Sequence, residues 1–433
     1  MKIFIISVAF LLFLSGCGEA PSSDGDTPTP APVVTQHSRN LLVVQINYND
    51  INFVNPDIWA DKIFGMREGE LNHYYMQISK NQFRFLPISE RNGVINDGVA
   101  TVRLNKNHPN PGNNFSLLHP DFKEALTQLD GDIDFSKYDT NLDSRISSKE
   151  LLIVFIVAGN EEAYGPSTLP GVFAHQYCVD SSNTACLDGV SLLSCSGKGN
   201  YAVFGERHED GARDATIGII AHELGHAAFG LPDLYDTTPS TLPDSAGIGY
   251  FGLMSAGMWG TKEPFGAKEG SSPTHMSAWS KVKNGWIKPK VIESSQGLHV
   301  NLYASDLESF NIIKIPISAD KYYLLENRAN SGYDRGLKAI DGIFRGGLAL
   351  WRVDEDIISQ NSASNSVNAD KNSKGVDLVE ATHEVLDSSA YEHGHEKNLF
   401  YYGNRDSYRD TFIKLEDISS RSEVMSASIS KLR

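Results

Sequence analysis

The feature that most constrains this chain is the segment from Ile217 to Asp236, which reads IGIIAHELGHAAFGLPDLYD. His222 and His226 are four residues apart among helix-favouring residues, so both imidazoles should leave one face of a helix, one turn apart. This spacing is typical of two nitrogen ligands to a zinc ion. Glu223 follows the first histidine and must point elsewhere, which makes it the candidate general base, acting on water at the metal.

The ends of this helix can also be predicted. Asp214 and Thr216 are both good N-cap residues, so the helix should begin near one of them. It should end at Gly230, because glycine readily takes the left-handed conformation at the C′ position and Pro232 cannot continue a helix. The chain is then expected to turn back toward the metal and to supply an oxygen ligand.

A methionine follows in a glycine-rich turn. Residues 249–260 read GYFGLMSAGMWG and place Met254 within that turn. A zinc helix, a glycine exit, a further ligand and a downstream methionine turn occur in this order in the metzincin proteases. The expected catalytic fold is therefore a mixed α/β (α+β) domain of metzincin type.

At the level of whole motifs, the chain resembles the immune inhibitor A family of bacterial secreted metalloproteases. This metzincin branch takes its third zinc ligand from the aspartate of a GLPD sequence, which is residues 230–233 here and implies Asp233 as the ligand. The resemblance covers nearly everything from Leu41 onward. It is carried by LLVVQINYNDINF from Leu41, LNHYYMQISKNQFRF from Leu71, VFAHQY from Val172, PTHMSAWSKVKNGW from Pro273, YYLLENR from Tyr322, GGLALWRVDED from Gly346 and SVNADKNSKGVDLVEA from Ser366.

The register of the third ligand departs from the common family pattern. Many relatives have glycine three residues after the second histidine, whereas Phe229 stands there and Gly230 comes one residue later. One extra helical residue rotates the exit by about 100° and advances it by about 1.5 Å. If the helix simply ends one residue later, Asp233 remains the ligand. Asp236 is the alternative, and Asp244 is a distant third.

The amino-terminal segment predicts export. Residues 1–17 (MKIFIISVAFLLFLSGC) carry a lysine and then an apolar run too short for a spanning helix, which indicates a signal peptide. Its end, LSGC, resembles the bacterial lipobox, which implies acylation of Cys17. The following residue, Gly18, is not aspartate, which favours the outer membrane or cell surface, with release into the medium as an alternative. Residues 18–40 are rich in Pro, Ser, Thr, Asp and Gly and are expected to form a disordered tether.

Composition sets the scale of the remainder. The chain has 433 residues, 40% hydrophobic and 21% charged, which suits two domains with real cores. We expect a catalytic domain over 41–289 and a mostly antiparallel β domain over 290–433. Strands are predicted over 41–47, 151–159, 298–303, 311–317, 322–326 and 347–353, and helices over 69–80 and 121–129. The net charge of −16 argues against nucleic acid as a partner.

A second metal site is predicted between residues 139 and 150, which read DTNLDSRISSKE. Oxygen donors occupy the positions used by an EF-hand calcium loop, although Ser144 replaces the usual glycine at the sharp turn. A central strand follows the loop instead of a helix, so the calcium would be structural. The donors are Asp139, Asn141, Asp143, Arg145 through its carbonyl, Ser147 and Glu150.

The cysteines allow one disulfide in an exported chain. Beyond Cys17 the sequence has Cys178, Cys186 and Cys195 in a long polar loop, and the sequence does not determine which two of them pair. The third is expected to be buried. A second polar stretch, 365–380, is rich in Asp and Asn, and surface loops of this kind usually bind nothing.

Together these features predict a zinc-dependent metalloendopeptidase, tethered by lipid and stabilised by calcium. Its partners would be protein or peptide substrates and, through the lipid, the membrane, and a monomer is expected. One alternative is a catalytically inactive surface-binding lipoprotein of the same fold, although Glu223 argues against it, because a structural zinc site has no use for that carboxylate. Another is a zinc hydrolase with a substrate other than protein.

Overall fold

The computed structural model describes residues 37–433 except 166, 209–210, 239–244, 263–267, 340–341 and 389–392. The signal peptide, the predicted lipidation site Cys17, the tether up to residue 36 and the third candidate ligand Asp244 therefore lie outside the described residues. Residues 36–433 form one compact unit. No helix within the described ranges is long and apolar enough to cross a membrane.

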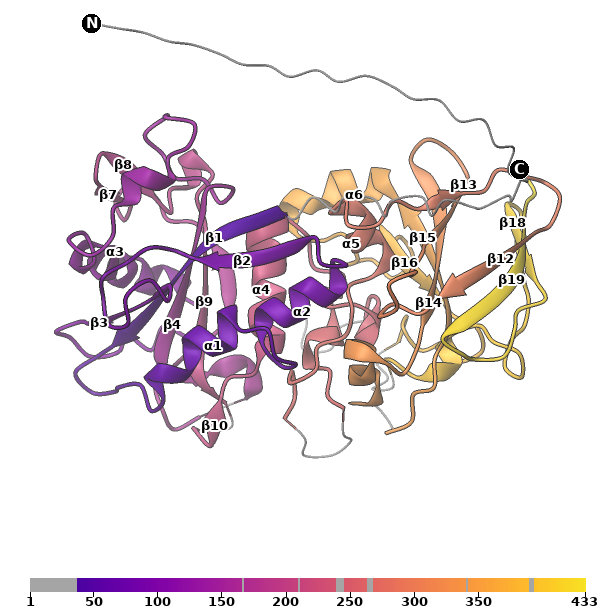
Figure 1. The fold of residues 1–433 in the computed structure, drawn as a ribbon. Helices are drawn as coiled ribbons and strands as arrows, with labels where there is room; N and C mark the ends of the chain where they lie inside the picture. Colours follow the sequence, from indigo (N-terminus) through magenta and orange to yellow (C-terminus); the bar gives the residue numbers. More distant parts are fainter. Residues whose placement is uncertain are drawn as a thin grey trace, which may run out of the picture. The chain divides into compact units, whose positions relative to one another are not determined.

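The amino-terminal half is built on an eight-stranded sheet (Figure 1). Five strands form its path in the order β10, β9, β4, β1, β2, and β3, β5 and β6 pair with β1, β4 and β9. The strands from β2 through β9 on this path are parallel, whereas β6 and β10 run antiparallel to β9. The strands are β1 (His37–Asn47), β2 (Phe83–Pro87), β3 (Val99–Arg103), β4 (Leu151–Glu161), β5 (Gly171–Val172), β6 (His175–Tyr177), β9 (Tyr201–His208) and β10 (Arg213–Asp214).

Both strands predicted for this half are present, and each is longer than predicted at one end. β4 is buried along its whole length and lies in the middle of the sheet, as predicted for the segment after the calcium loop. β1 begins at His37 and not at Leu41, because residues 37–41 pair with β2 along its whole length. Residues 37–40, predicted to belong to the tether, therefore belong to the sheet.

Helices cover both faces of this sheet because its inner strands are apolar on both sides. Leu41 and Val43 belong to the core that also holds residues of α2 and α4, while Leu42 and Val44 belong to the core that holds residues of α3. The predicted helices at 69–80 and 121–129 are confirmed with shorter or shifted bounds. The helices are α1 (Trp59–Phe64), α2 (Leu71–Ile78), α3 (His119–Gln128) and α4 (Ile217–Phe229).

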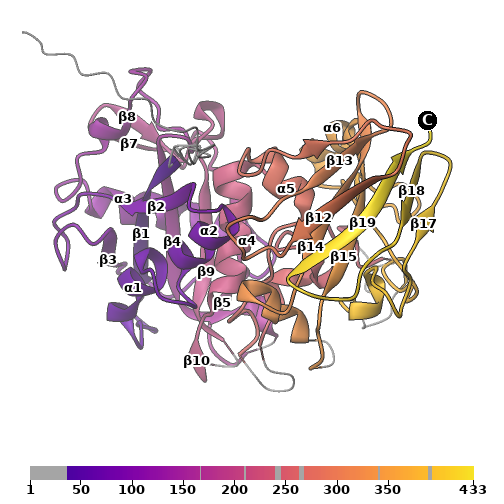
Figure 2. The same ribbon diagram turned by 45° about the vertical axis from the view of Figure 1, so that its right-hand side comes forward.

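The carboxy-terminal part contains two further sheets, mostly antiparallel as predicted (Figure 2). One has the order β11, β13, β14, β15, β16 and the other the order β12, β19, β18, β17. Their bounds are β11 (Lys290–Val291), β12 (Leu298–Tyr303), β13 (Ile313–Pro316), β14 (Lys321–Arg328), β15 (Gly347–Asp354), β16 (Val376–Val379), β17 (Tyr408–Arg409), β18 (Ile413–Glu416) and β19 (Val424–Lys431), with helices α5 (Ala278–Lys283) and α6 (Glu355–Asn361). The predicted fold class, a mixed α/β protease domain with additional antiparallel β sheets, is confirmed.

The two parts share a core. The core that contains α4 runs from Leu41 to Leu399 and includes Trp279, Leu324 and Trp351, so it takes residues from both sides of Pro289. The two C-terminal sheets enclose a separate core between them, with Val300 and Tyr323 among its members. The boundary at Pro289 stays a prediction.

A buried group of charges ties the C-terminal sheet to the segment before Met254. The Arg328 guanidinium is fully buried and donates from Nε to Asp334 Oδ2 at 2.6 Å and from Nη1 to the carbonyl oxygen of Phe251 at 2.6 Å. Lys281 donates to Glu326 Oε2 at 2.8 Å beside it. Because a buried charge is tolerated only when it is paired, these bonds fix β14 against the methionine turn.

Candidate metal centre

Helix α4 carries the histidine pair and has the predicted ends. Thr216 is the N-cap residue, and Gly230 follows the last helical residue with a left-handed φ of 63°. The Gly230 N–H donates to the carbonyl oxygen of His226 at 2.8 Å, which closes the final turn. Phe229, the residue that shifts the register, packs against Phe83 and Trp286 with ring centroids 4.7 and 5.0 Å away. The extra residue therefore prolongs the helix and enters the core.

The chain turns back after Gly230 and brings Asp233 to the two histidines. The Nε2 atoms of His222 and His226 are 3.1 Å apart, and Asp233 Oδ1 lies 3.0 Å from the first and 3.2 Å from the second. Four bonds of about 2.0–2.2 Å to a tetrahedral zinc ion place neighbouring ligand atoms roughly 3.3 Å apart. The observed separations fit that geometry.

The hydrogen bonds behind the rings set the histidine tautomers. His222 Nδ1 is 2.9 Å from the carbonyl oxygen of Leu253, and His226 Nδ1 is 2.5 Å from that of Leu231. A carbonyl oxygen only accepts, so each Nδ1 carries a proton and a neutral ring offers the Nε2 lone pair to the cluster. This is the arrangement in which metal-binding histidines are oriented by a second partner.

The charges of the cluster also call for a cation. Asp233 Oδ1 is buried and accepts no hydrogen bond from the described residues. Burial opposes protonation of His226, but Asp233 beside it raises its pKa to about 9. Burial favours the neutral acid of Asp233, yet the two histidines hold its pKa well below the ordinary value. The cluster thus favours positive charge at its centre, which a proton or a metal ion can supply.

Glu223 and Met254 complete the predicted site. Glu223 is buried and lines the same cavity as the ligand cluster, and burial raises its pKa although the two histidines act in the opposite direction. Met254 packs beneath the helix, because a Cβ atom on Gly225 would lie 2.5 Å from its sulfur. The Leu234 N–H donates to the Met254 carbonyl oxygen at 2.7 Å, which holds the methionine turn against the exit segment.

The cavity over the site has a volume of about 520 Å³, and four parts of the chain line it. They are Phe115, residues 174–177 at β6, α4 with its exit segment, and Ser362, Ala363 and Asn365 of the C-terminal part. The sequence analysis did not identify the lining residues outside α4 and its exit segment. Their only sequence signal was the VFAHQY stretch, which contains His175, whereas nothing marked Asn365 within its polar loop.

His175 illustrates how the orientation of a residue that lines the cavity is fixed. Its ring stacks on Phe115 at a centroid distance of 4.1 Å, and its Nδ1 lies 2.8 Å from the carbonyl oxygen of Phe173. Its Nε2 is 3.0 Å from the hydroxyl of Tyr201, which is also 3.0 Å from His119 Nε2. The ring is therefore fixed from both ends, and it presents a rigid surface to the cavity.

Asp236, the alternative candidate for the third zinc ligand, makes other contacts. Asp236 Oδ1 accepts hydrogen bonds from the N–H and the hydroxyl of Thr238, at 2.9 and 2.5 Å. It does not belong to the cluster of metal-binding side chains found among the described residues, which consists of His222, His226 and Asp233. The short segment after α4 is thus long enough to bring Asp233, the first candidate for the third ligand, to the two histidines.

The predicted calcium loop, residues 139–150, is compact and folds around two carboxylates. Glu150 Oε2 accepts from the N–H and hydroxyl of Ser147 at 2.9 and 2.7 Å, and Asp139 Oδ2 accepts from the Ser144 N–H at 2.9 Å. Ser144 has a φ of 60°, the left-handed conformation expected for the glycine position of such a loop. The carboxylates of Asp139 and Glu150, both buried, therefore accept hydrogen bonds from within the loop.

The cysteine pair left open by the sequence is Cys178 with Cys195, which form a disulfide with a Cα–Cα distance of 5.0 Å. Cys186 is free and exposed. The expectation that the unpaired cysteine is buried was wrong: Cys186 lies on β7 (Ala185–Leu187), which pairs with β8 (Val190–Leu192), and it is exposed between two buried neighbours.

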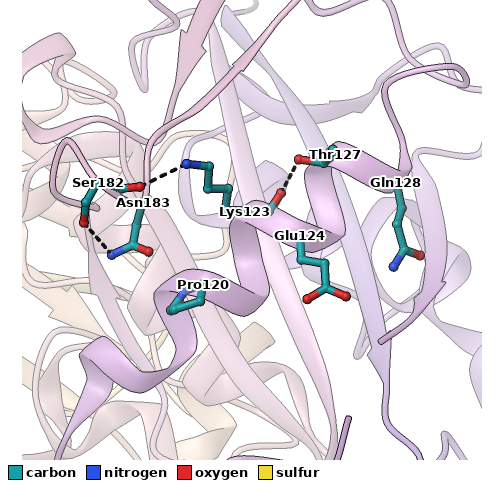
Figure 3. Close-up of a pocket in the computed structure, with 7 residues that line it drawn as sticks. All are labelled: Pro120, Lys123, Glu124, Thr127, Gln128, Ser182 and Asn183. Atoms are coloured by element: carbon teal, nitrogen blue, oxygen red, sulfur yellow. Dashed lines mark hydrogen bonds between the residues drawn. The ribbon is translucent and has the colours of Figure 1, made fainter. Parts of the chain in front are cut away.

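Another hollow lies between α3 and the loop that contains Ser182 and Asn183 (Figure 3). Lys123 donates to the carbonyl oxygen of Ser182 at 3.0 Å across it. Apart from Pro120 its lining residues are polar, and they include neither histidine nor cysteine. The hollow offers no set of ligands comparable with that of the cavity at α4.

Comparison with known families matches the part of the chain that contains this site. The family model described as immune inhibitor A peptidase M6, catalytic domain, matches residues 100–287, which include α4 and the methionine turn. A comparison with curated proteins found no match.

Among solved structures, the chain is similar to OgpA from Akkermansia muciniphila. Wild-type OgpA in two crystal forms is 14% and 13% identical, the alignments cover 75% and 77% of this chain and 86% and 94% of OgpA, and both TM-scores are 0.29. Catalytically inactive OgpA in complex with an O-glycopeptide substrate, glycodrosocin, is 14% identical over 75% of this chain and 85% of OgpA, with a TM-score of 0.29. A TM-score this low supports no conclusion about the present chain.

The two aspartates can be separated by their effect on metal affinity. Asp233→Ala should weaken zinc binding by more than the ~10–100-fold typical of changes behind a ligand, since it removes a ligand atom. Asp236→Ala, the matched control three residues away, should have a smaller effect. Zinc dissociation constants measured by competition with a chelator would test this, and the reverse ranking would transfer the ligand role to Asp236.

Proposed function

We propose that this chain, which belongs over residues 100–287 to the immune inhibitor A peptidase M6 family, holds its catalytic zinc ion with His222, His226 and Asp233 and uses Glu223 as the general base. The chain is a zinc metalloendopeptidase, and its substrates are proteins or peptides. The observation that carries the residue assignment is the convergence of the three ligand atoms beside a buried glutamate in one cavity.

The zinc ion, when bound, supplies a Lewis acid that polarises the scissile carbonyl and lowers the pKa of water. The protein supplies the proton transfers. Glu223 stands one residue from His222 and faces the same cavity. Burial raises the pKa of its carboxylate, which makes it a better proton acceptor near neutral pH. Glu223 takes the proton of the attacking water and then gives it to the leaving amine.

The remaining groups keep this arrangement in place. The Leu253 and Leu231 carbonyl oxygens hold the histidine rings, so neither ring must reorient when a peptide binds. Residues 174–177 and the segment at Ser362 both line the cavity and provide surfaces that a substrate chain would contact. The site is accordingly rigid at its base and walled by two distant parts of the sequence.

The role of Glu223 can be tested without disturbing the ligands. Glu223→Gln keeps the size of the side chain but removes its ability to accept a proton. It should therefore retain about one zinc per chain. The rate of peptide hydrolysis should fall by several orders of magnitude, as expected when a general base is removed. Zinc content and the rate on casein must be measured on the same preparation. Wild-type rates in this variant would contradict the assignment.

We also propose a structural calcium ion in the loop from Asp139 to Glu150. Support comes from the oxygen donors at EF-hand spacing and from the left-handed conformation of Ser144, which lets the loop turn back on itself. The loop connects α3 and the short helix over Phe135–Tyr138 to the central strand β4. A bound ion would stabilise the start of that strand.

The calcium proposal predicts a stability effect that depends on the ion. Glu150→Gln should reduce the rise in melting temperature that calcium produces, because ligand binding to the folded state stabilises it by mass action. The melting temperatures of wild type and variant should differ less in a calcium chelator than in calcium. An equal rise on adding calcium to both proteins would contradict the site.

We propose finally that the mature protein is anchored in the cell envelope through lipid on Cys17. Support comes from the signal-peptide pattern of residues 1–17 and the LSGC sequence at its end. The tether after Cys17 would hold the catalytic unit away from the membrane surface.

Lipidation of Cys17 can be tested by metabolic labelling with a fatty acid in a bacterial host. Cys17→Ser should abolish the label and shift the protein to the soluble fraction. Cys186→Ser, which removes the exposed free cysteine, is the matched control and should keep the label. Labelling that persists in the Cys17 variant would refute the anchor.

A further inference from the structure

We propose that Asn365 positions the third metal ligand, so that the C-terminal β region determines the metal affinity of the catalytic site. This inference rests on the proposed zinc site. Asn365 follows the short helical turn over Ser362–Ser364, which comes after α6, and it is 132 residues away from Asp233 in sequence. Both residues line the same cavity.

Asn365 contacts Asp233 through both ends of its amide. Its Nδ2 donates to Asp233 Oδ2 at 2.6 Å, and its Oδ1 accepts from the Asp233 backbone N–H at 2.8 Å. The first bond occupies one carboxylate oxygen and leaves Oδ1 directed at the two histidines, at 3.0 and 3.2 Å. The second bond fixes the backbone of the exit segment. Together the two bonds restrict the carboxylate to one orientation, in which Oδ1 is the oxygen that remains available to a metal ion.

The position of Asn365 is itself fixed from two sides. Its N–H donates to the carbonyl oxygen of Ser362 at 3.1 Å, and its own carbonyl oxygen accepts from the hydroxyl of Thr237 at 2.8 Å. Its φ of 52° lies in the left-handed region, which asparagine tolerates better than most residues. The amide is therefore held on a rigid turn and does not reach out from a long, freely rotating side chain.

Only an amide satisfies both contacts. A carboxylate at position 365 would still accept from the Asp233 N–H, but it could not donate to Oδ2 and would place a second negative charge beside it. Asp233 is only 5% exposed with Asn365 in place, so a change at position 365 removes a hydrogen-bond donor from a largely buried carboxylate. Partners placed behind a metal ligand typically contribute about 10–100-fold to metal affinity.

The test uses Asn365→Gly as the main variant, because glycine keeps the left-handed φ without strain and removes only the side chain. We expect its zinc dissociation constant to rise about 10–100-fold. We also expect the visible absorption bands of the cobalt-substituted protein to shift, because the free carboxylate can change its binding mode. Asn365→Asp should weaken zinc binding at least as much. Ser364→Ala, one residue away and exposed, is the matched control and should behave as wild type.

The outcomes separate this inference from the zinc site itself. If wild type binds zinc and Asp233→Ala loses it, while both Asn365 variants keep wild-type affinity and cobalt spectra, the inference is overturned and the zinc site stands. Weakened zinc binding in a variant whose metal-free form also melts well below the metal-free wild type would overturn it too, since that result indicates a general structural role. If wild type binds no zinc, the proposed function fails.

Discussion

Three ligand atoms meet within 3.2 Å of one another in a buried site, and the surrounding structure must keep them there. Two lone pairs and a carboxylate oxygen repel one another when no cation lies between them, so each group must be held from behind. Carbonyl oxygens of Leu253 and Leu231 hold the two rings, and Asn365 holds the carboxylate. These restraints come from the methionine turn, the helix exit and the C-terminal part.

The packing of the molecule follows from the same requirement. Gly225 gives Met254 the space to lie beneath the zinc helix, and this places the Leu253 carbonyl oxygen under His222. The segment before Met254 is bonded to β14, because the buried Arg328 donates to the carbonyl oxygen of Phe251. The C-terminal part therefore contacts the candidate metal centre in two ways, through the bond of Arg328 to Phe251 and through Asn365. It acts as part of the catalytic structure and not only as an appended module.

Local patterns in the sequence were enough to predict the parts of this site that depend on local structure. The four-residue spacing of His222 and His226, the stop at Gly230 and the buried strand after Glu150 each follow from the geometry of one element, and each was confirmed. The start of β1 at His37 was missed because strand pairing with β2 decides it, and the pairing partner is distant in sequence. Asn365 was missed for the same reason. A single polar residue in a loop gains its role only when folding brings it to Asp233.

The central claim is that His222, His226 and Asp233 hold one zinc ion in this chain. Zinc K-edge X-ray absorption spectroscopy of the zinc-loaded protein tests it directly, because imidazole ligands give a characteristic multiple-scattering pattern. The account predicts two imidazole nitrogens at about 2.0–2.1 Å together with oxygen ligands at about 2.0–2.2 Å, and one imidazole fewer in His226→Ala. Sulfur at about 2.3 Å, or a spectrum unchanged by His226→Ala, would contradict it.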